Sequence, residues 1–316
     1  MALPNRLSKA NRPAALQGLT VLERGWLSSN NVVLHGGGQG AVLVDSSHAL
    51  HGAQTLALLR QTLGDEPLVQ LLNTHLHSDH CGGNAGVQRA WACRITVPPG
   101  DFAAACDWDE DRLSYAATGQ ICERFLPDDC IHPGQTLAVG DRRWLALAAP
   151  GHDPHSIMLF DAEHGVLISA DALWEDGFGV VFPELDGAQA FDEVGQVLDL
   201  IESLDARWVI PGHGPVFEDL PGALLRARQR LASFVADPAR HAWHALRVMV
   251  KYHLLEQQRA SWPDFERWFA SASLCSAVWH RLGRPEGTLA GFGRRTVRDL
   301  VARGALDERD GIILNL

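Results

Sequence analysis

Short apolar segments separated by glycine-rich or polar turns recur through the first hundred residues and predict strands. The sequence GGGQG at residues 36–40 predicts a hairpin connection. It is only a weak candidate for a phosphate-binding loop, because the Lys-Ser/Thr pair of such a loop is missing and no helix follows at once. Five strands are predicted here, at residues 19–23, 31–35, 41–45, 68–72 and 94–97.

Segments with helical spacing of apolar residues alternate with strands as far as about residue 217. Residues 49–63 have this spacing, and Gly64 ends the segment. Further helices are predicted at residues 101–125 and 188–204, and further strands at residues 144–148, 156–160, 166–169 and 208–210. This alternation predicts an α/β fold.

The pattern changes after Pro221, where helical spacing dominates. A polar turn at residues 309–311 and a last apolar run predict a final strand, and helices followed by such a strand resemble the end of a winged-helix domain. We therefore predict an N-terminal arm at residues 1–18, a first domain at residues 19–220 and a helical, winged-helix-like domain at residues 221–316. The predicted helices of the last domain are at residues 223–236, 239–258, 264–270, 274–281 and 294–303.

Composition and charge restrict the choice of partners. Hydrophobic residues make up 46% of the 316 residues and charged residues 21%, as in globular proteins. A net charge of -11 repels phosphate backbones at long range, which disfavours nucleic acid. Nucleic acid stays open as an alternative partner, and the appended helices suit a homodimer. Arginine is plentiful in the last third, which supports that alternative; examples are Arg226, Arg228, Arg230, Arg240, Arg247 and Arg259.

Targeting and membrane segments are not recognisable in the sequence. The N-terminal residues lack the apolar run of a signal peptide, and no stretch reaches the roughly 18 apolar residues of a membrane span. None of the six cysteines forms a Cys-x-x-Cys pair. We expect a cytoplasmic protein with reduced thiols and no membrane partner.

A cluster of histidines and aspartate directly follows the strand predicted at residues 68–72. Spacing by two places the imidazoles of His75 and His77 on one side of an extended chain, while Asp79 and His80 can turn to a second position. Imidazole and carboxylate groups this close together suit zinc and similar metals. The alternative is a histidine-rich surface turn.

Three more candidate ligands lie at later strand ends or loops. They are His152 in Pro-Gly-His, Asp171 in Ser-Ala-Asp and His213 in Pro-Gly-His-Gly. Each alone is uninformative. Their order behind the first cluster, and their positions at strand ends, make them candidates.

Together these residues resemble the metallo-β-lactamase superfamily, whose pattern is His-x-His-x-Asp-His followed by His, Asp and His. The resemblance covers residues 19–218 and implies a four-layer αββα sandwich. It implies that one metal binds His75, His77 and His152. The second would bind Asp79, His80 and His213, and Asp171 would bridge the two. Asp45 matches the buried aspartate that supports the ligands in this family.

The implied chemistry is hydrolysis by a hydroxide that bridges two divalent metals about 3.5–4 Å apart. We expect zinc, with iron or manganese as alternatives. Asp79 is placed to orient the hydroxide and accept its proton, so it is the expected catalytic residue. The bridging aspartate makes the ligand set more similar to glyoxalase II than to class B β-lactamases, which disfavours β-lactams as substrates.

Other residues near these motifs have two interpretations each. His155 either points towards the pocket or is a loop histidine, and Cys81 is either a further ligand or a small buried residue. The aromatic residues Trp174, Phe178 and Phe182 follow the bridging aspartate, beside glycines that suggest a flexible loop. They form either packing between the domains or an apolar wall for an acyl or aromatic substrate.

Three functions remain open at this point. The first is hydrolysis of a small-molecule thioester, lactone or related ester; the C-terminal segment lacks the Lys/Arg and Tyr pattern by which glyoxalase II binds glutathione. The second is a phosphodiesterase or ribonuclease, although no aromatic and basic ladder for single strands is present. The third is a nucleic-acid-binding regulatory module with a vestigial metal site.

Overall fold

The computed structural model describes residues 13–316, so most of the predicted N-terminal arm lies outside the described residues. A short 3-10 turn at Ala14–Leu16 leads into a six-stranded sheet with the strand order β1-β2-β3-β4-β5-β6. Neighbours are antiparallel from β1 to β3 and parallel from β3 to β6. The strands are β1 (Leu19–Leu22), β2 (Asn31–Leu34), β3 (Ala41–Val44), β4 (Leu68–Leu72), β5 (Arg94–Val97) and β6 (Asp129–Cys130).

A second sheet has five strands in the order β11-β10-β9-β8-β7. Its neighbours are antiparallel except for the parallel pair of β10 and β11. The strands are β7 (Thr136–Val139), β8 (Arg142–Ala148), β9 (Ile157–Asp161), β10 (Val166–Ala170) and β11 (Trp208–Pro211).

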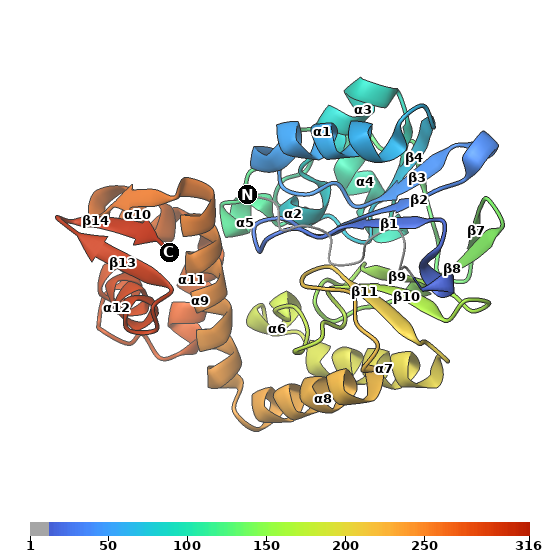
Figure 1. Cartoon of the computed structure of the whole chain (residues 1–316). Coiled ribbons are helices and arrows are strands. Elements are labelled where there is room, and N and C mark those ends of the chain that lie inside the picture. Colours follow the sequence, from blue (N-terminus) through green and yellow to red (C-terminus); the bar gives the residue numbers. More distant parts are fainter. Residues whose placement is uncertain (1–12) are drawn as a thin grey trace.

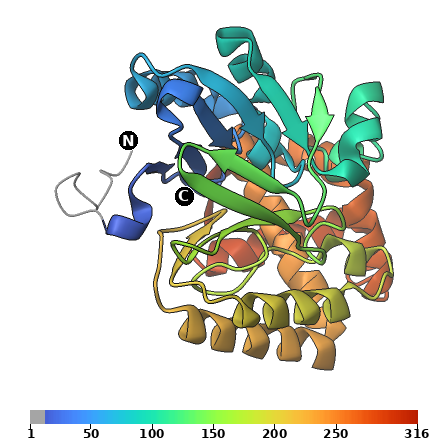
Figure 2. The ribbon, with the colours of Figure 1, turned by 90° about the vertical axis from the view of Figure 1, so that its right-hand side faces the viewer.

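Helices cover the outer face of each sheet, and the four layers are visible in Figure 1. The helices of the first half are α1 (Gly52–Leu63), α2 (Ser78–Cys81), α3 (Asn84–Trp91), α4 (Pro99–Asp107) and α5 (Tyr115–Thr118). Those of the second half are α6 (Phe182–Leu185) and α7 (Ala190–Ser203). Figure 2 shows α7 lying under the second sheet, beside the first helix of the C-terminal region.

Alternating side chains in the strands explain the layers. In β4, Leu71 packs in the core under α1 and α3, whereas its neighbour Leu72 packs in the core between the two sheets. In β9, Leu159 faces the inter-sheet core, and Met158 and Phe160 face α7. Both faces of β9 are buried and it is an apolar run as far as Asp161, whereas β4 has the exposed Val69 and the half-buried Gln70 between its buried residues. The predicted four-layer αββα sandwich is confirmed.

The C-terminal region is mainly helical, as predicted, and its buried core also includes Val180 and Leu185 from the segment around α6. A three-stranded antiparallel sheet in the order β12-β14-β13 closes this core. The winged-helix assignment stays a prediction. The helices are α8 (Leu220–Ala236), α9 (Pro238–Gln257), α10 (Trp262–Ser271), α11 (Ser273–Arg281) and α12 (Leu289–Ala302), and the strands are β12 (Arg259–Ser261), β13 (Leu306–Arg309) and β14 (Ile312–Asn315).

Buried polar contacts join α9 to the sandwich. The Glu256 carboxylate lies 3.0 Å from Nε2 of His48, and both side chains are buried. The hydroxyl of Tyr252, one turn earlier, lies 2.9 Å from Oγ of Ser78 in the histidine cluster. The helical region therefore contributes side chains next to the predicted metal site.

The prediction of a mostly helical segment at residues 101–125 is wrong. Only α4 and the one-turn α5 are helical there. Trp108 and Ser114 adopt left-handed φ angles of 60° and 64°, which end a right-handed helix. The short strands β6, β7, β12 and β13 were not predicted. Among residues 13–316, no helix is long and apolar enough to cross a membrane.

Candidate metal centre

The predicted ligands lie at one edge of the sandwich because each follows the carboxyl end of a strand. Parallel neighbours bring their carboxyl ends to the same edge, and this applies to β3 with β4 and to β10 with β11. Asp45 follows β3, the histidine cluster follows β4, His152 follows β8, Asp171 follows β10 and His213 follows β11.

The segment after β4 places its histidines in two groups. His75 and His77 face one side, with Nε2 of His75 3.1 Å from Nδ1 of His77, while Leu76 between them points into the core. This is the alternation that the spacing predicted. The chain then turns into α2, which brings Asp79 and His80 to the other side.

The structure brings all seven predicted ligands together. Ligand atoms of His75, His77 and His152 lie within 4.8 Å of one another, and so do those of Asp79, His80 and His213. These are the two sets that the family resemblance implied.

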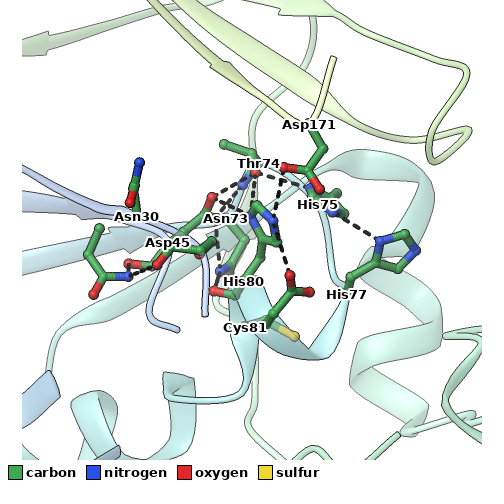
Figure 3. A network of polar contacts seen from close by, with 12 residues as sticks. Asn30, Asp45, Asn73, Thr74, His75, His77, His80, Cys81 and Asp171 are labelled. Atoms are coloured by element: carbon green, nitrogen blue, oxygen red, sulfur yellow. Dashed lines mark hydrogen bonds and ion pairs between the residues drawn. The ribbon is translucent and has the colours of Figure 1, made fainter. Parts of the chain in front are cut away.

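Asp171 lies between the two sets. One carboxylate oxygen is 3.4 Å from Nε2 of His80, and the other is 3.4 Å from Nε2 of His152. Figure 3 shows Asp171 above His75 and His80. The position suits a bridging ligand.

The donor atoms fit divalent metals. Nε2 of His80 is fully buried and makes no hydrogen bond among the described residues, but it faces carboxylate oxygens of two other candidate ligands, Asp171 at 3.4 Å and Asp79 at 3.8 Å, as expected of an atom that shares a metal with them. Burial lowers the pKa of His77 and of His152 to about 4. Both imidazoles are therefore neutral at pH 7, which is the form that binds metal.

Charges in the centre are strongly coupled. Burial raises the pKa of Asp79, but the neighbouring His80 and His213 outweigh burial and bring it to about 2. Asp171 is held well below its ordinary pKa by His80 and His213 in the same way. Burial acts to lower the pKa of His80, yet the surrounding aspartates raise it overall. Both carboxylates are ionised at neutral pH, as metal ligands must be.

A second layer of contacts fixes the orientation of the histidines. Nδ1 of His80 lies 2.8 Å from the buried carboxylate of Asp45, which also accepts hydrogen bonds from the backbone and hydroxyl of Thr74 (Figure 3). Nδ1 of His152 lies 2.6 Å from the carbonyl oxygen of Val180. Each contact leaves the Nε2 atom facing the centre. The supporting position expected for Asp45 is confirmed.

Backbone geometry at Gly212 allows the close approach of these groups. A Cβ atom at this position would lie 2.1 Å from the Asp171 carboxylate and 3.1 Å from the His80 ring. A residue with a side chain would displace both ligands. The glycine in Pro-Gly-His-Gly is therefore required by the site itself.

Two further candidates lie outside the centre. His155 is exposed on a loop, with Nε2 4.0 Å from a carboxylate oxygen of Asp101. Cys81 is buried, and its thiol contacts the carbonyl oxygen of Leu76 and the hydroxyl of Tyr115. The alternative interpretations, a loop histidine and a small core residue, are therefore the ones that the structure supports.

A pocket of about 800 Å³ opens over the centre. Its walls include Trp174, Phe178 and Phe182, as the apolar-wall hypothesis predicted. Phe178 is also buried against Phe234 of α8, as the alternative of packing between the domains predicted. The ring of Phe182 lies 5.2 Å from that of His77 and 5.6 Å from that of His152. An acyl group bound against Phe182 would thus lie beside the candidate ligands.

Several pocket residues were not found from the sequence. Trp26 is 63% exposed and stacks on His213 at a ring separation of 5.5 Å, although nothing in its sequence context marks it. Tyr252 and several basic residues enter from the helical region. The spacing of apolar residues identified the helices of this region, but it could not show which face of each helix meets the pocket.

A comparison with family models identifies the fold family. The model described as "Metallo-beta-lactamase superfamily" matches residues 24–213, which include all seven candidate ligands. The chain belongs to the metallo-beta-lactamase superfamily. Together with the His/Asp clusters, this makes it a metal-dependent hydrolase of that superfamily.

Curated relatives within this superfamily include two kinds of named enzyme. An acyl-coenzyme A thioesterase MBLAC2 from Gallus gallus is 25% identical over 228 residues, covering 66% of this chain and 81% of the relative. A hydroxyacylglutathione hydrolase from Nitrobacter winogradskyi is 34% identical over 116 residues. That match spans 36% of this chain and 38% of the relative.

Solved structures extend the likeness to the whole chain. The crystal structure of a metallo-beta-lactamase family protein from Thermus thermophilus has a TM-score of 0.56 at 22% identity. It covers 96% of this chain and 100% of that chain. The fold likeness therefore includes the helical region after residue 220 as well as the superfamily sandwich.

Proposed function

We propose that this superfamily member hydrolyses thioesters with two divalent metals, of which zinc is our first choice. The observation that carries the proposal is the pair of three-ligand sets joined by Asp171 beneath an apolar pocket. Both named relatives support it, because acyl-coenzyme A and hydroxyacylglutathione are thioesters. Lactones and related esters belong to the same reaction type and stay within the proposal.

One metal would be held by His75, His77 and His152, the other by Asp79, His80 and His213, and Asp171 would contact both. When bound, such metals supply an activated water and a Lewis acid for the substrate carbonyl. The protein itself provides the orientation. Asp45 and the Val180 carbonyl hold two ligand histidines so that their Nε2 atoms face the centre.

Asp79 is the residue we assign to proton transfer. Its carboxylate lies 3.0 Å from Nε2 of His213 and lines the pocket, so it reaches both the ligand set and the substrate space. His80 and His213 keep it ionised, as a proton acceptor requires. Phe182 and the neighbouring apolar residues exclude bulk water on the acyl side.

A substrate panel tests the proposal. Zinc-loaded protein is assayed with thioesters, lactones, β-lactams, phosphodiesters and RNA, alongside an Asp171→Ala variant. We expect turnover of thioesters, lost in the variant. Two bound metals with no thioester or ester turnover would contradict the proposal, and cleavage of RNA alone would favour the phosphodiesterase alternative.

A further inference from the structure

Basic side chains from the helical region line one wall of the pocket. Arg230 comes from α8, Arg247 and Lys251 come from α9, and Arg303 follows α12. The chain as a whole has a net charge of -11, so a group of four basic side chains in one pocket differs from its overall acidic character. We call these four residues the cationic wall.

Three members of the cationic wall already have polar partners. Asp299 serves two of its members, with one oxygen 3.0 Å from Nη1 of Arg247 and 3.1 Å from Nε of Arg303. Lys251 donates to the main-chain oxygens of Ala305 and Leu316 and to the side-chain amide oxygen of Asn315. Glu175 and Asp176 line the same pocket, and Asp176 pairs with Arg226, so the wall offers hydrogen-bond donors rather than a large net positive charge.

Arg230 is the member with the most unused hydrogen-bonding capacity. Its guanidinium makes no hydrogen bond or ion pair with residues 13–316. It lies against the backbone of Gly177, where an added Cβ atom would be 2.6 Å from its central carbon. This contact holds a half-buried guanidinium, with its donors unfilled, at the pocket wall.

The same pocket contains the candidate metal centre, so one substrate can touch both. His77, Asp79, His152, Asp171 and His213 line it together with the cationic wall. In a thioester, the acyl carbon must reach the centre, and the thiol half then occupies another part of the pocket. Guanidinium and ammonium groups in the lining suit phosphate, which arginine binds through two parallel hydrogen bonds.

We propose that the cationic wall binds the phosphates of the leaving thiol, so that the substrates are acyl thioesters of a phosphorylated carrier of the coenzyme A type. This inference rests on the proposed thioester hydrolysis. Coenzyme A offers a diphosphate and a phosphomonoester, which match the guanidinium and ammonium donors of the cationic wall. Glutathione offers two carboxylates, and a simple lactone offers no anion.

A series of shortened substrates tests this inference. The same acyl group is presented on coenzyme A, on pantetheine, which lacks the diphosphate and the nucleotide, and on glutathione. We expect KM for the coenzyme A thioester to be about tenfold or more below that for the pantetheine thioester, because charge-assisted hydrogen bonds contribute that much. Raising the salt concentration should reduce this advantage.

Two variants locate the effect. Arg230→Gln should raise KM for the coenzyme A thioester about tenfold while changing kcat little. Arg228→Gln is the matched control, because Arg228 lies on the same helix, pairs with Asp199 and Glu202, and does not line the pocket. It should leave the kinetics of all three substrates unchanged.

Binding of coenzyme A itself to metal-free protein, measured by calorimetry, gives a readout that does not depend on turnover. We expect salt-sensitive binding that Arg230→Gln weakens. Equal KM values for coenzyme A and pantetheine thioesters, with no binding of free coenzyme A, would overturn the inference and leave thioester hydrolysis intact. If no thioester is cleaved while coenzyme A binds, the proposed reaction fails and the phosphate site stands.

Discussion

Replacing Asp45 by asparagine should weaken metal binding without removing any ligand. The Asp45 carboxylate is 3% exposed and lies 2.8 Å from Nδ1 of His80. It accepts two hydrogen bonds from Thr74, one from the backbone at 2.9 Å and one from the hydroxyl at 2.8 Å. An amide of the same shape has only one accepting oxygen, so its NH2 group must face either the Thr74 backbone donor or His80.

The expected size of the effect follows from these contacts. At least one hydrogen bond to a buried charge is lost, which costs about 1.5–3 kcal/mol. The imidazole of His80 is then held less firmly with Nε2 towards the metal. Changes of this kind lower metal affinity by roughly 10–100-fold. Zinc affinity is measured by competition with a chromophoric chelator, and thermal unfolding of the metal-free protein is followed in parallel.

Asp161→Asn is the matched control. Asp161 is 1% exposed and lies 2.7 Å from Nε of Arg142, at the end of β9 away from the metal centre. It should lower stability to a similar degree and leave zinc affinity unchanged. The reasoning is refuted if Asp45→Asn binds zinc as tightly as the wild type, or if Asp161→Asn loses as much affinity.

Three further predictions concern stability and metal dependence. Glu256→Gln breaks the buried pair with His48 and should lower the free energy of unfolding by about 3 kcal/mol in urea denaturation, whereas a loss under about 1 kcal/mol would mean the pair is not stabilising. Glu123→Gln breaks an exposed ion pair with Arg89 and should leave Tm unchanged, because exposed pairs stabilise little; a drop of several degrees would mean that this pair does stabilise the protein. Removing metal with a chelator should lower Tm and abolish hydrolysis, with zinc restoring both, and activity that survives chelation would speak against a metal-dependent reaction.

The ligand positions could be predicted because the ligands either lie close together in the sequence or follow the end of a strand. Spacing by two placed His75 and His77 on one side, and the structure has them there. His152, Asp171 and His213 are far apart in sequence, yet each follows a strand, and strand ends meet at one edge of a sandwich. The family pattern then supplied their pairing into two sets.

The pocket walls could not be predicted in the same way. Apolar spacing identified α8 and α9 as helices, but the destination of Arg230 and Tyr252 depends on how those helices pack on the sandwich. Periodicity contains no information about that docking. The helix expected at residues 101–125 failed for a different reason, since Trp108 and Ser114 adopt left-handed conformations that their residue types do not favour.

A zinc titration of metal-free protein tests the central claim most directly. Bound metal and hydrolysis of an acyl-coenzyme A thioester are measured on the same samples, for the wild type and for Asp171→Ala. The account predicts that hydrolysis rises until two metals are bound per chain, and that the variant stays below a thousandth of the wild-type rate, roughly the loss when a group that stabilises the transition state is removed. Hydrolysis at full rate without metal, or in the variant, would contradict it.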